Sequence, residues 1–363
     1  MTFREKEILD LLKENPSISQ QHLADKLDIT RSSVAVHITN LMKKGHILGK
    51  GYILAKENYV TVIGCSNIDL LGRSNDKILM NDSNPGKVEI SAGGVGRNIA
   101  ENLARLNVEV KLLSAVGNDL YGKQLLSHCK DTNIDVDDVY ISDEIPSSTY
   151  LSILNENNEM QLAISHMDIS DKIDIKYITQ RHNFIKESMA IVVDTNINEE
   201  VINYITSTYN NIPIFVDAVS SYKCLKLKNK LSNIHTLKLN KLEAESLTNI
   251  KIHNYDDLVL CSHHLLTQGV RNVFITLGPD GVFCFNKDEQ ILIDGMKNVN
   301  VVNATGAGDA FAAALVYSYI NKFNLENSAR FAMAASVIAL SHKDTINPNI
   351  SIKNIEKLLK ETY

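Results

Sequence analysis

The chain lacks the features of an exported or membrane-spanning protein. No stretch approaches the roughly 20 apolar residues that a transmembrane helix needs. Charges at Arg4, Glu5, Lys6, Glu7 and Asp10 interrupt the first residues, so these do not form the apolar core of a signal peptide. The five cysteines are odd in number and form no CxxC pair, which argues against a disulfide framework or a zinc site. We therefore expect a cytoplasmic protein with reduced thiols and no membrane partner.

The two commonest nucleotide-binding fingerprints are also missing. The chain contains neither a GxxxxGK[ST] phosphate loop nor a GxGxxG turn. Its composition, with 44% hydrophobic and 22% charged residues and a net charge of −6, is that of a folded globular protein. At 363 residues it exceeds what one core usually organises, so we expect a large domain with a smaller one attached.

The first 57 residues have the pattern of a small helical module. Apolar spacing predicts a helix up to Leu12, which the pair Asn15-Pro16 ends because a residue before proline disfavours helical geometry. A second helix is predicted over residues 20–27, with Ser17 and Gln20 spaced as a capping box. A third helix follows, so the module begins with three short helices.

The third helix and the segment after it complete this module. Thr30 can cap the helix, and a stripe of apolar residues predicts its buried face: Val34, Ile38, Leu41 and Met42. Residues 46–54 alternate around glycines like a small hairpin. Three helices and a hairpin resemble the winged helix-turn-helix modules of bacterial transcriptional regulators.

Acidic residues are absent from positions 30–56, which is a favourable charge pattern for binding DNA phosphates. A polar third helix and a basic hairpin would supply phosphate contacts and some base contacts. The residues that we assign to DNA binding are Arg31, Ser32, Ser33, His37, Lys43, Lys44 and Lys50. The alternative is a module for dimerisation or packing whose lysines are only solvated. The acid-free stretch favours DNA binding over that alternative.

Residues 58–363 predict a second domain of the α/β class. Short apolar runs alternate with helical patterns, which is typical of a mainly parallel sheet. Strands are predicted at 60–65, 111–115, 190–194, 214–217, 236–239 and 273–277. Two more, 150–154 and 160–165, flank a turn-like Asn155-Glu156-Asn157-Asn158 and predict a hairpin that projects from the sheet as a lid.

The strongest chemical pattern is the run from Asn303 to Asp309, Asn-Ala-Thr-Gly-Ala-Gly-Asp, before a helix of small residues. Its glycines leave backbone N–H groups exposed at the positive end of a helix, where a phosphate can bind. A carboxylate directly after them can accept the proton of an attacking hydroxyl group. By itself the run is equally compatible with an ordinary helix start in which Asp309 is a first-turn acid.

Three further groups of residues favour a ligand site. Gly93 and Gly94 permit a close backbone approach, and Asn98 after them can bind vicinal hydroxyls. Asn67 and Asp69 follow the first strand, where an open α/β sheet places ligand contacts.

The third group is Asn240 and Glu243, which stand one helical turn apart after the strand 236–239 and suit Mg²⁺ waters or phosphate. Arg97, beside the paired glycines, either approaches the substrate or forms a structural ion pair. The sequence leaves these two alternatives open.

Together these motifs resemble the ribokinase (PfkB-type) family of sugar kinases from about Tyr59 to the end of the chain. The resemblance implies a three-layer α/β/α domain with a mainly parallel sheet and a small β lid. It also implies Asp309 as the base. The other implied roles are an anion hole at Gly306, Ala307 and Gly308, substrate contacts at Asn67, Asp69, Gly93, Gly94, Arg97 and Asn98, Mg-ATP binding through Asn240 and Glu243, and nucleotide contacts at Thr276, Gly278, Gly281 and Thr305.

One position departs from the family pattern. Many members have an aspartate two residues before the threonine of this run, as part of a monovalent cation site, whereas this chain has Asn303. An amide or carbonyl oxygen can still ligate K⁺. Potassium is therefore a weaker expectation than ATP and Mg²⁺.

Within the family, segments such as 82–87, 93–100, 114–119 and 239–245 resemble those of bacterial kinases of the nucleoside pseudouridine. That resemblance implies transfer of the γ-phosphoryl group of ATP to the 5′-hydroxyl of pseudouridine, and we expect a homodimer. The alternatives are a kinase of another nucleoside or a ribose-like sugar, and a DNA-binding regulator that uses a kinase-like domain as a ligand sensor.

Overall fold

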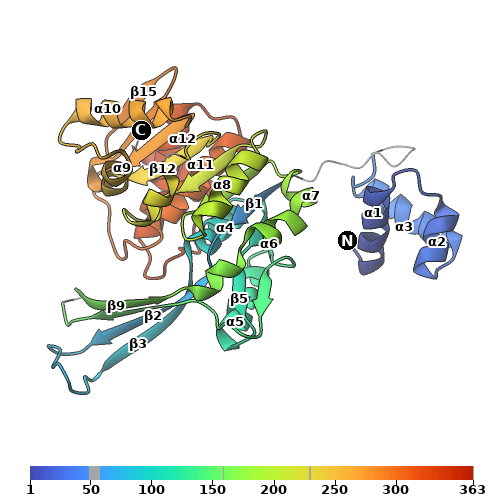
Figure 1. Ribbon diagram of the computed structural model, residues 1–363, viewed down its shortest axis with the longest axis horizontal. Helices are drawn as coiled ribbons and strands as arrows, with labels where there is room; N and C mark the ends of the chain where they lie inside the picture. The colour runs from blue at the N-terminus through green and yellow to red at the C-terminus, as the bar shows by residue number, and fades with distance from the viewer. Residues whose placement is uncertain (49–57, 158, 229, 363) are drawn as a thin grey trace. The chain divides into compact units, whose positions relative to one another are not determined.

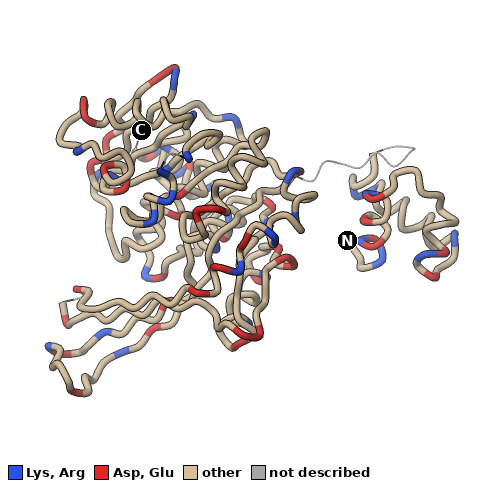
Figure 2. Tube along the Cα trace, viewed as in Figure 1, with Lys and Arg blue, Asp and Glu red and all other residues tan. Residues whose placement is uncertain are grey.

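The computed structural model describes residues 1–48, 58–157, 159–228 and 230–362. The chain forms two compact units, Met1–Glu57 and Asn58–Tyr363. Figure 2 shows acidic and basic residues interspersed along the larger unit, with neither sign confined to one segment. Among the described residues, no helix has both the length and the apolar character that crossing a membrane requires.

The smaller unit contains the three predicted helices, α1 (Phe3–Glu14), α2 (Gln20–Leu27) and α3 (Arg31–Lys43). Thr30 caps α3 as predicted, because its hydroxyl accepts a hydrogen bond from the N–H of Ser33. The predicted capping box of Ser17 and Gln20 is wrong. The hydroxyl of Ser19, the residue directly before α2, accepts the N–H of His22 instead.

These three helices enclose a core of their own, formed by Ile8, Leu9, Leu12, Ile18, Leu23, Ala24, Val34, Ile38, Leu41 and Ile47. Met42, predicted for this core, is 44% exposed and lies in the last turn of α3. Most of the predicted hairpin and Lys50 lie outside the described residues.

The larger unit is built on a sheet that, among the described residues, has nine strands in the order β15-β14-β13-β12-β11-β10-β1-β4-β6. All neighbours are parallel except the antiparallel pairs β13–β14 and β14–β15. The strands are β1 (Tyr59–Ile63), β4 (Glu109–Leu113), β6 (Ile134–Asp135), β10 (Ala190–Asp194), β11 (Ile214–Asp217), β12 (Thr236–Asn240), β13 (Asn272–Thr276), β14 (Val282–Asn286) and β15 (Gln290–Ile293). The predicted α/β class with a mainly parallel sheet is confirmed.

Alternate residues of the central strands enter two separate cores, one on each face of the sheet. In β10, for example, Ala190 and Val192 belong to one core, and Ile191 and Val193 to the other. The first core is covered by α4 (Val95–Arg105), α5 (Leu120–Asp131), α11 (Ala307–Ile320), α12 (Leu325–Leu340) and α13 (Ile352–Thr362). The second is covered by α6 (Ile175–Gln180), α7 (His182–Ile185), α8 (Glu199–Thr208), α9 (Lys241–Thr248) and α10 (Tyr255–Thr267). The unit therefore has three layers, α/β/α.

Four strands form a second, smaller sheet that projects from the body of this unit (Figure 1). Their order is β3 (Gly86–Gly93), β2 (Asn67–Ser74), β8 (Thr149–Leu154) and β9 (Met160–His166). The predicted hairpin is β8 and β9, which pair antiparallel. Sequence reasoning missed β2 and β3, which complete the lid.

One predicted strand is divided between two sheets. The segment predicted at 111–115 belongs to β4 up to Leu113, but Ala115 begins β5 (Ala115–Gly117), which pairs with β7 (Tyr140–Ser142). An apolar run that bends in this way looks continuous in the sequence, because both parts are buried.

Candidate functional site

The run that ends in Asp309 forms the start of helix α11. Gly306 occupies the N-cap position with φ +84°, and a Cβ atom there would lie 2.0 Å from the carbonyl oxygen of Thr345, so only glycine fits. Ala307, Gly308 and Asp309 are the first three helical residues, whose N–H groups have no acceptor within a helix. This geometry can bind a phosphoryl oxygen at the positive end of the helix.

Asp309 is 9% exposed, and its Oδ2 accepts a hydrogen bond of 2.7 Å from Nδ2 of Asn98. Burial and, after it, the negative charge of Asp217 raise the pKa of Asp309 to about 7, against the opposing effects of Asn98 and Lys238. A carboxyl group with a pKa near neutrality is suited to accepting and releasing a proton at physiological pH.

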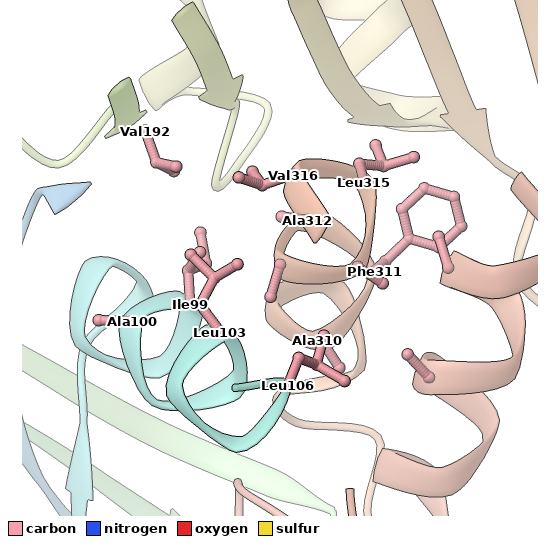
Figure 3. Packing of buried hydrophobic residues seen from close by; sticks show 14 of the residues in the cluster. Ile99, Ala100, Leu103, Leu106, Val192, Ala310, Phe311, Ala312, Leu315 and Val316 are labelled. Atoms are coloured by element: carbon pink, nitrogen blue, oxygen red, sulfur yellow. The ribbon is translucent and has the colours of Figure 1, made fainter. Parts of the chain in front are cut away.

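Helix α4 brings Asn98 to this place. Helices α4 and α11 pack side by side through Ile99, Leu103 and Leu106 on one and Ala310 to Val316 on the other (Figure 3). Asn98 and Asp309 therefore meet although 211 positions separate them in the sequence.

A lysine–aspartate pair that sequence reasoning missed lies against the same helix start. Nζ of Lys238 is 3.0 Å from Oδ2 of Asp217, and both side chains are buried. A Cβ atom on Gly308 would lie 2.8 Å from the same Nζ, so the ammonium group lies close to the glycine. The charge of Asp217 is the main influence that raises the pKa of Lys238, against the opposing effect of burial.

The signal for this pair was a single charged residue inside an apolar strand, Lys238 between Leu237 and Leu239. Such a residue is costly to bury without a partner. The sheet register supplies the partner, because Asp217 of β11 lies directly opposite Lys238 of β12.

The carboxyl ends of the parallel strands collect further polar groups. Asp194 ends β10 opposite Asp217, and Asn240 ends β12 opposite Thr276 of β13. The fully buried carboxylate of Asp194 accepts hydrogen bonds from the N–H groups of Cys65 and Gly96. These bonds connect the segment after β1 to the first turn of α4. Burial raises the pKa of Asp194.

Helix α4 starts at Val95, so Arg97 and Asn98 lie in its first turn. The guanidinium of Arg97 is 1% exposed, lies 2.6 Å from Glu101, and also donates to the carbonyl oxygens of Ala92 and Gly93. Arg97 thus forms the structural ion pair, one of the two alternatives that the sequence left open, and its contact with substrate stays a prediction.

The predicted pair Asn67 and Asp69 lies at the beginning of lid strand β2. Nδ2 of Asn67 donates to Oδ1 of Asp69 at 2.6 Å, and a Cβ atom on Gly93 would lie 2.3 Å from Oδ2 of Asp69. Gly93 is therefore required for this carboxylate to pack against the β3 backbone. Burial raises the pKa of Asp69, against the effects of Asn67 and Arg97.

Register gives the two faces of the lid different characters. Asp69 lies in one cross-strand row with Ser91, Tyr150 and Ser165, which makes a polar face. The neighbouring row lies on the opposite face and is apolar, with Ile90, Leu70, Leu151 and Ile164. Two residues further along the strands, the same face carries Val88, Ile153 and Leu162. Val88, Ile90, Leu162 and Ile164 are each more than half exposed.

Asn240 and Glu243 form a closed capping box at the start of α9. Oε2 of Glu243 accepts the N–H of Asn240, Oε1 accepts its side-chain amide, and Oδ1 of Asn240 accepts the N–H of Glu243, all within 2.9 Å. Glu243 is 2% exposed, and burial raises its pKa. Its carboxylate thus holds Asn240 in place.

The predicted nucleotide segment forms a tight turn at the end of β13. Gly278 and Gly281 have φ of +65° and +102°, and a Cβ atom on Gly281 would lie 2.0 Å from the carbonyl oxygen of Ile293. Gly278 has open space above it, which leaves its backbone accessible. The hydroxyl of Thr276 donates to the carbonyl oxygen of Leu239, which ties β13 to β12.

Asn303 uses its side chain within its own loop. Oδ1 accepts the N–H of Thr305 at 2.9 Å, and Nδ2 donates to the carbonyl oxygen of Lys343 at 2.9 Å. The side-chain oxygen of Asn303, which the sequence analysis considered as a K⁺ ligand, therefore already accepts a hydrogen bond from Thr305. Among the described residues, no group of three or more His, Cys, Asp or Glu side chains is arranged to hold a metal ion.

The structure thus brings several of the predicted site residues into two groups. Asn98 links Arg97 to Asp309, and Gly308 lies against Lys238 and its partner Asp217. A third group lies at the base of the lid and consists of Asn67, Asp69 and Gly93. The positive charge of Arg97 acts on this group by lowering the pKa of Asp69.

The predicted DNA-binding residues of α3 differ in their surroundings. Arg31, Ser32 and Lys43 are exposed, and Ser33 and His37 are partly exposed. Lys44 lies 2.6 Å from the buried Glu5, and this hydrogen bond is the main cause that lowers the pKa of Glu5 to about 2. Lys44 therefore has a structural partner within the unit.

Sequence comparisons identify the family. The profile of pfkB family carbohydrate kinases matches residues 57–352, and that of winged helix-turn-helix DNA-binding domains matches residues 4–47. The chain belongs to the pfkB family of carbohydrate kinases and carries an N-terminal winged helix-turn-helix domain. It is a phosphotransferase that uses ATP, typically with Mg²⁺, to phosphorylate a hydroxyl group of a sugar or nucleoside. The resemblance found in the sequence is confirmed.

Two relatives from Escherichia coli K12 are similarly close. Its pseudouridine kinase is 39% identical over 307 residues, which are 85% of this chain and 98% of that protein. Its uncharacterized sugar kinase YeiI is 38% identical over 360 residues, 99% of both chains. The fold also matches Arabidopsis thaliana ribokinase in complex with ribose and ATP, with a TM-score of 0.74 at 20% identity over 84% of this chain and 99% of that one.

Proposed function

We propose that this kinase transfers the γ-phosphoryl group of ATP to the 5′-hydroxyl of pseudouridine, with Asp309 as the base. The observation that carries the proposal is the buried carboxylate of Asp309 at the start of α11, held by Asn98 and beside N–H groups that have no helical acceptor. The 39% identity with pseudouridine kinase over nearly its whole length supports the choice of substrate.

In the proposed reaction, ionised Asp309 accepts the proton of the 5′-hydroxyl as that oxygen attacks the γ-phosphorus of ATP. The bond from the γ-phosphorus to the bridging oxygen breaks, and ADP leaves with the electron pair. Asn98 donates to the carboxylate and orients it toward the hydroxyl.

The start of α11 stabilises the charge on the transferring phosphoryl group. The N–H groups of Ala307 and Gly308 point out of the helix, where the helix dipole adds to their attraction for an anion. The ammonium group of Lys238 lies beside Gly308 and adds a positive charge at the same place. Asp217 holds that ammonium group in position.

Asn240, Thr276, Gly278 and Gly281 are proposed to bind the nucleotide, and Thr305 to contact its phosphates. Glu243 contributes by fixing Asn240, since both of its oxygens bind that residue. Mg²⁺, which commonly binds through substrate phosphates while keeping several waters, would neutralise the phosphate charge. Asn240 is exposed at the strand end and suits a contact to one of those waters.

Asp69, Asn67 and the polar face of the lid are proposed to bind the ribose hydroxyls. A carboxylate accepts two hydroxyl donors, and Asn67 keeps it oriented. Arg97 stabilises the end of β3 against which Asp69 packs, because it donates hydrogen bonds to two carbonyl oxygens of that strand. Its ion pair with Glu101 fixes the guanidinium group.

A specific observation also favours a second substrate class. The chain is 38% identical to a sugar kinase over 99% of both chains, a match that includes the N-terminal unit. A free sugar is therefore the alternative to pseudouridine. The fold, the base and the phosphate site would serve either acceptor.

The test is a panel of acceptors with Mg-ATP, in which ADP release is followed for pseudouridine, uridine, ribose and fructose phosphates. We expect pseudouridine to have the highest kcat/KM, with a phosphorylated product. A good rate on another acceptor beside no rate on pseudouridine would exclude the proposed substrate and leave the kinase assignment intact. No turnover of any acceptor, together with ligand-dependent DNA binding, would favour a sensor.

We further propose that the N-terminal unit binds DNA through α3 and that the chain forms a homodimer through the lid. Exposed Arg31, Ser32 and Lys43 support the first proposal. The second is supported by the exposed apolar lid face, because such a surface in water favours association, and a two-fold dimer brings two copies of one face together.

A further inference from the structure

A hollow of about 300 Å³ lies at the edge of the central sheet opposite the candidate active site. Its floor is a row of four neighbours in register, Phe215, Thr236, Asn272 and Asn286, at the amino ends of β11, β12 and β13 and the end of antiparallel β14. Asp217, Asn240 and Thr276 occupy the carboxyl ends of the same three parallel strands. The hollow is therefore distinct from the site around Asp309.

Aromatic rings surround one part of this hollow. His235 has ring centroids 5.3 Å from Phe215 and 4.7 Å from Tyr319, and Phe215 and Tyr319 are 5.6 Å apart. Tyr319 and Phe323 are 38% and 39% exposed, so flat apolar surface remains open to a ligand. A planar ring gains stacking contacts from such walls.

Except for Glu289, the polar side chains among the described residues that line the hollow are neutral hydrogen-bonding groups. Burial, followed by the charge of Arg271, lowers the pKa of His235 to about 4, so its imidazole is uncharged near neutral pH. Its Nδ1 pairs with the hydroxyl of Thr236 at 2.9 Å. In the described part of the chain, the structure gives no hydrogen bond to its Nε2 or to the hydroxyl of Tyr319. Both can bind a ligand.

The charge of the lining restricts the class of ligand. Glu289 is the only charged side chain among the described residues that line the hollow. Arg271, whose charge acts on His235, is not part of the lining, whereas Glu289 is and repels an anion, so the lining disfavours phosphorylated or carboxylated molecules. The dimensions, the rings and the neutral polar groups together suit a small uncharged heterocycle.

We propose that this hollow is a second ligand site, which binds an uncharged nucleobase-like heterocycle between its aromatic walls. This site is independent of the substrate proposed above, because free bases lack the ribose hydroxyls and the 5′-hydroxyl on which the active site would act. Its occupant stacks on Tyr319 and Phe215 and exchanges hydrogen bonds with His235.

The test is equilibrium dialysis of the full chain with uracil and with adenine. We expect one equivalent of at least one base to bind with a Kd below about 1 mM. Orotate, the uracil ring with an added carboxylate, should bind at least about tenfold more weakly because of Glu289. Failure of the wild-type chain to bind either base, or equal binding of orotate, would overturn the proposal.

Variants locate the binding site. Tyr319→Ala and, separately, Phe323→Ala should weaken binding about tenfold or more, as expected for loss of a stacked ring. Tyr317→Ala is the matched control on the same helix, since Tyr317 stacks on Phe331 and does not line the hollow. Asp69→Ala should leave base binding unchanged. Binding lost in Asp69→Ala but kept in both ring variants would assign the bases to the active site instead.

Discussion

At the scale of single residues, the chemistry is concentrated on one carboxyl group whose environment opposes its ionisation. Asp309 is buried next to Asp217, and Lys238 offsets part of the repulsion while Asn98 binds one oxygen. A base with a pKa near 7 is ionised in a large fraction of molecules at neutral pH and still holds a proton well enough to remove it from a hydroxyl.

We expect Asp309→Asn to lower kcat by about 10²- to 10⁴-fold, the usual range for a lost general base. Binding of ATP should change little, because an asparagine keeps the volume and can accept the hydrogen bond from Asn98. Steady-state kinetics and calorimetric ATP titration measure the two effects. A variant with nearly normal turnover would refute the role of Asp309 as base.

The pKa of Asp309 also predicts two pH dependences. The rate constant kcat/KM should rise with pH and level off above about 7, because only the ionised carboxylate accepts the proton. Between the ordinary pKa of 3.8 and about 7, the folded protein binds a proton that the unfolded chain has lost, so the free energy of unfolding falls as pH rises.

Thermal melts of the Asp309→Asn variant check the second dependence. The variant cannot ionise, so its Tm relative to the wild-type protein should be higher at about pH 8 than at about pH 4. A difference in Tm that is the same at both pH values would show that Asp309 has an ordinary pKa in the folded state.

At the scale of elements, the connection between lid strand β3 and helix α4 requires a glycine at position 94. Gly94 is the N-cap of α4 with φ +97°, and a Cβ atom would lie 2.4 Å from the carbonyl oxygen of Cys65 and 2.6 Å from Cα of Ser66. Both contacts are with backbone, which cannot move aside like a side chain. Asn98 and Arg97 follow in the same helix turn.

Gly94→Ala should therefore destabilise the protein by at least about 3 kcal/mol, since strain at positive φ adds to a backbone clash. Gly278→Ala is the matched control. Gly278 has φ +65° but open space around it, so the expected cost is about 1 kcal/mol. Urea unfolding of the two variants measures the difference, and equal costs would contradict the close packing at Gly94.

At the scale of the whole molecule, the lid has one polar face and one apolar face, and the apolar face has no cover within the described chain. Ile90→Lys together with Ile164→Lys should convert the proposed dimer to a monomer, because two dimer faces would bring four added charges together. Sedimentation equilibrium measures the mass. Ala163→Lys, at an exposed position that pairs with Ser152 on the other face of β9, is the control and should leave the dimer intact.

The N-terminal unit predicts a salt-dependent interaction with DNA. Binding of genomic fragments should weaken steeply with salt, and Arg31→Ala or Lys43→Ala should each reduce the slope of log K against log salt by about 1. Lys357→Ala, a change at an exposed lysine of α13, should not alter that slope. Absence of DNA binding would favour the packing role for this unit.

Sequence by itself determined the features that depend on neighbours along the chain. The apolar spacing of α3, its cap at Thr30, the alternation of strands and helices and the glycines before Asp309 all express backbone geometry within a few residues. Local physics is enough for such patterns. The cap of α2 was misjudged because Ser19, two residues after Ser17, satisfies the same local rule.

Tertiary structure alone decided which of these patterns meet. Asn98 reaches Asp309 because α4 and α11 pack on the same face of the sheet, and Lys238 finds Asp217 because β11 and β12 are neighbours in register. The fold buries the guanidinium of Arg97 against Glu101, which forms the ion pair that the sequence offered as one of two alternatives. Strand order and side-chain burial depend on contacts between residues far apart in the chain, and no local pattern contains them.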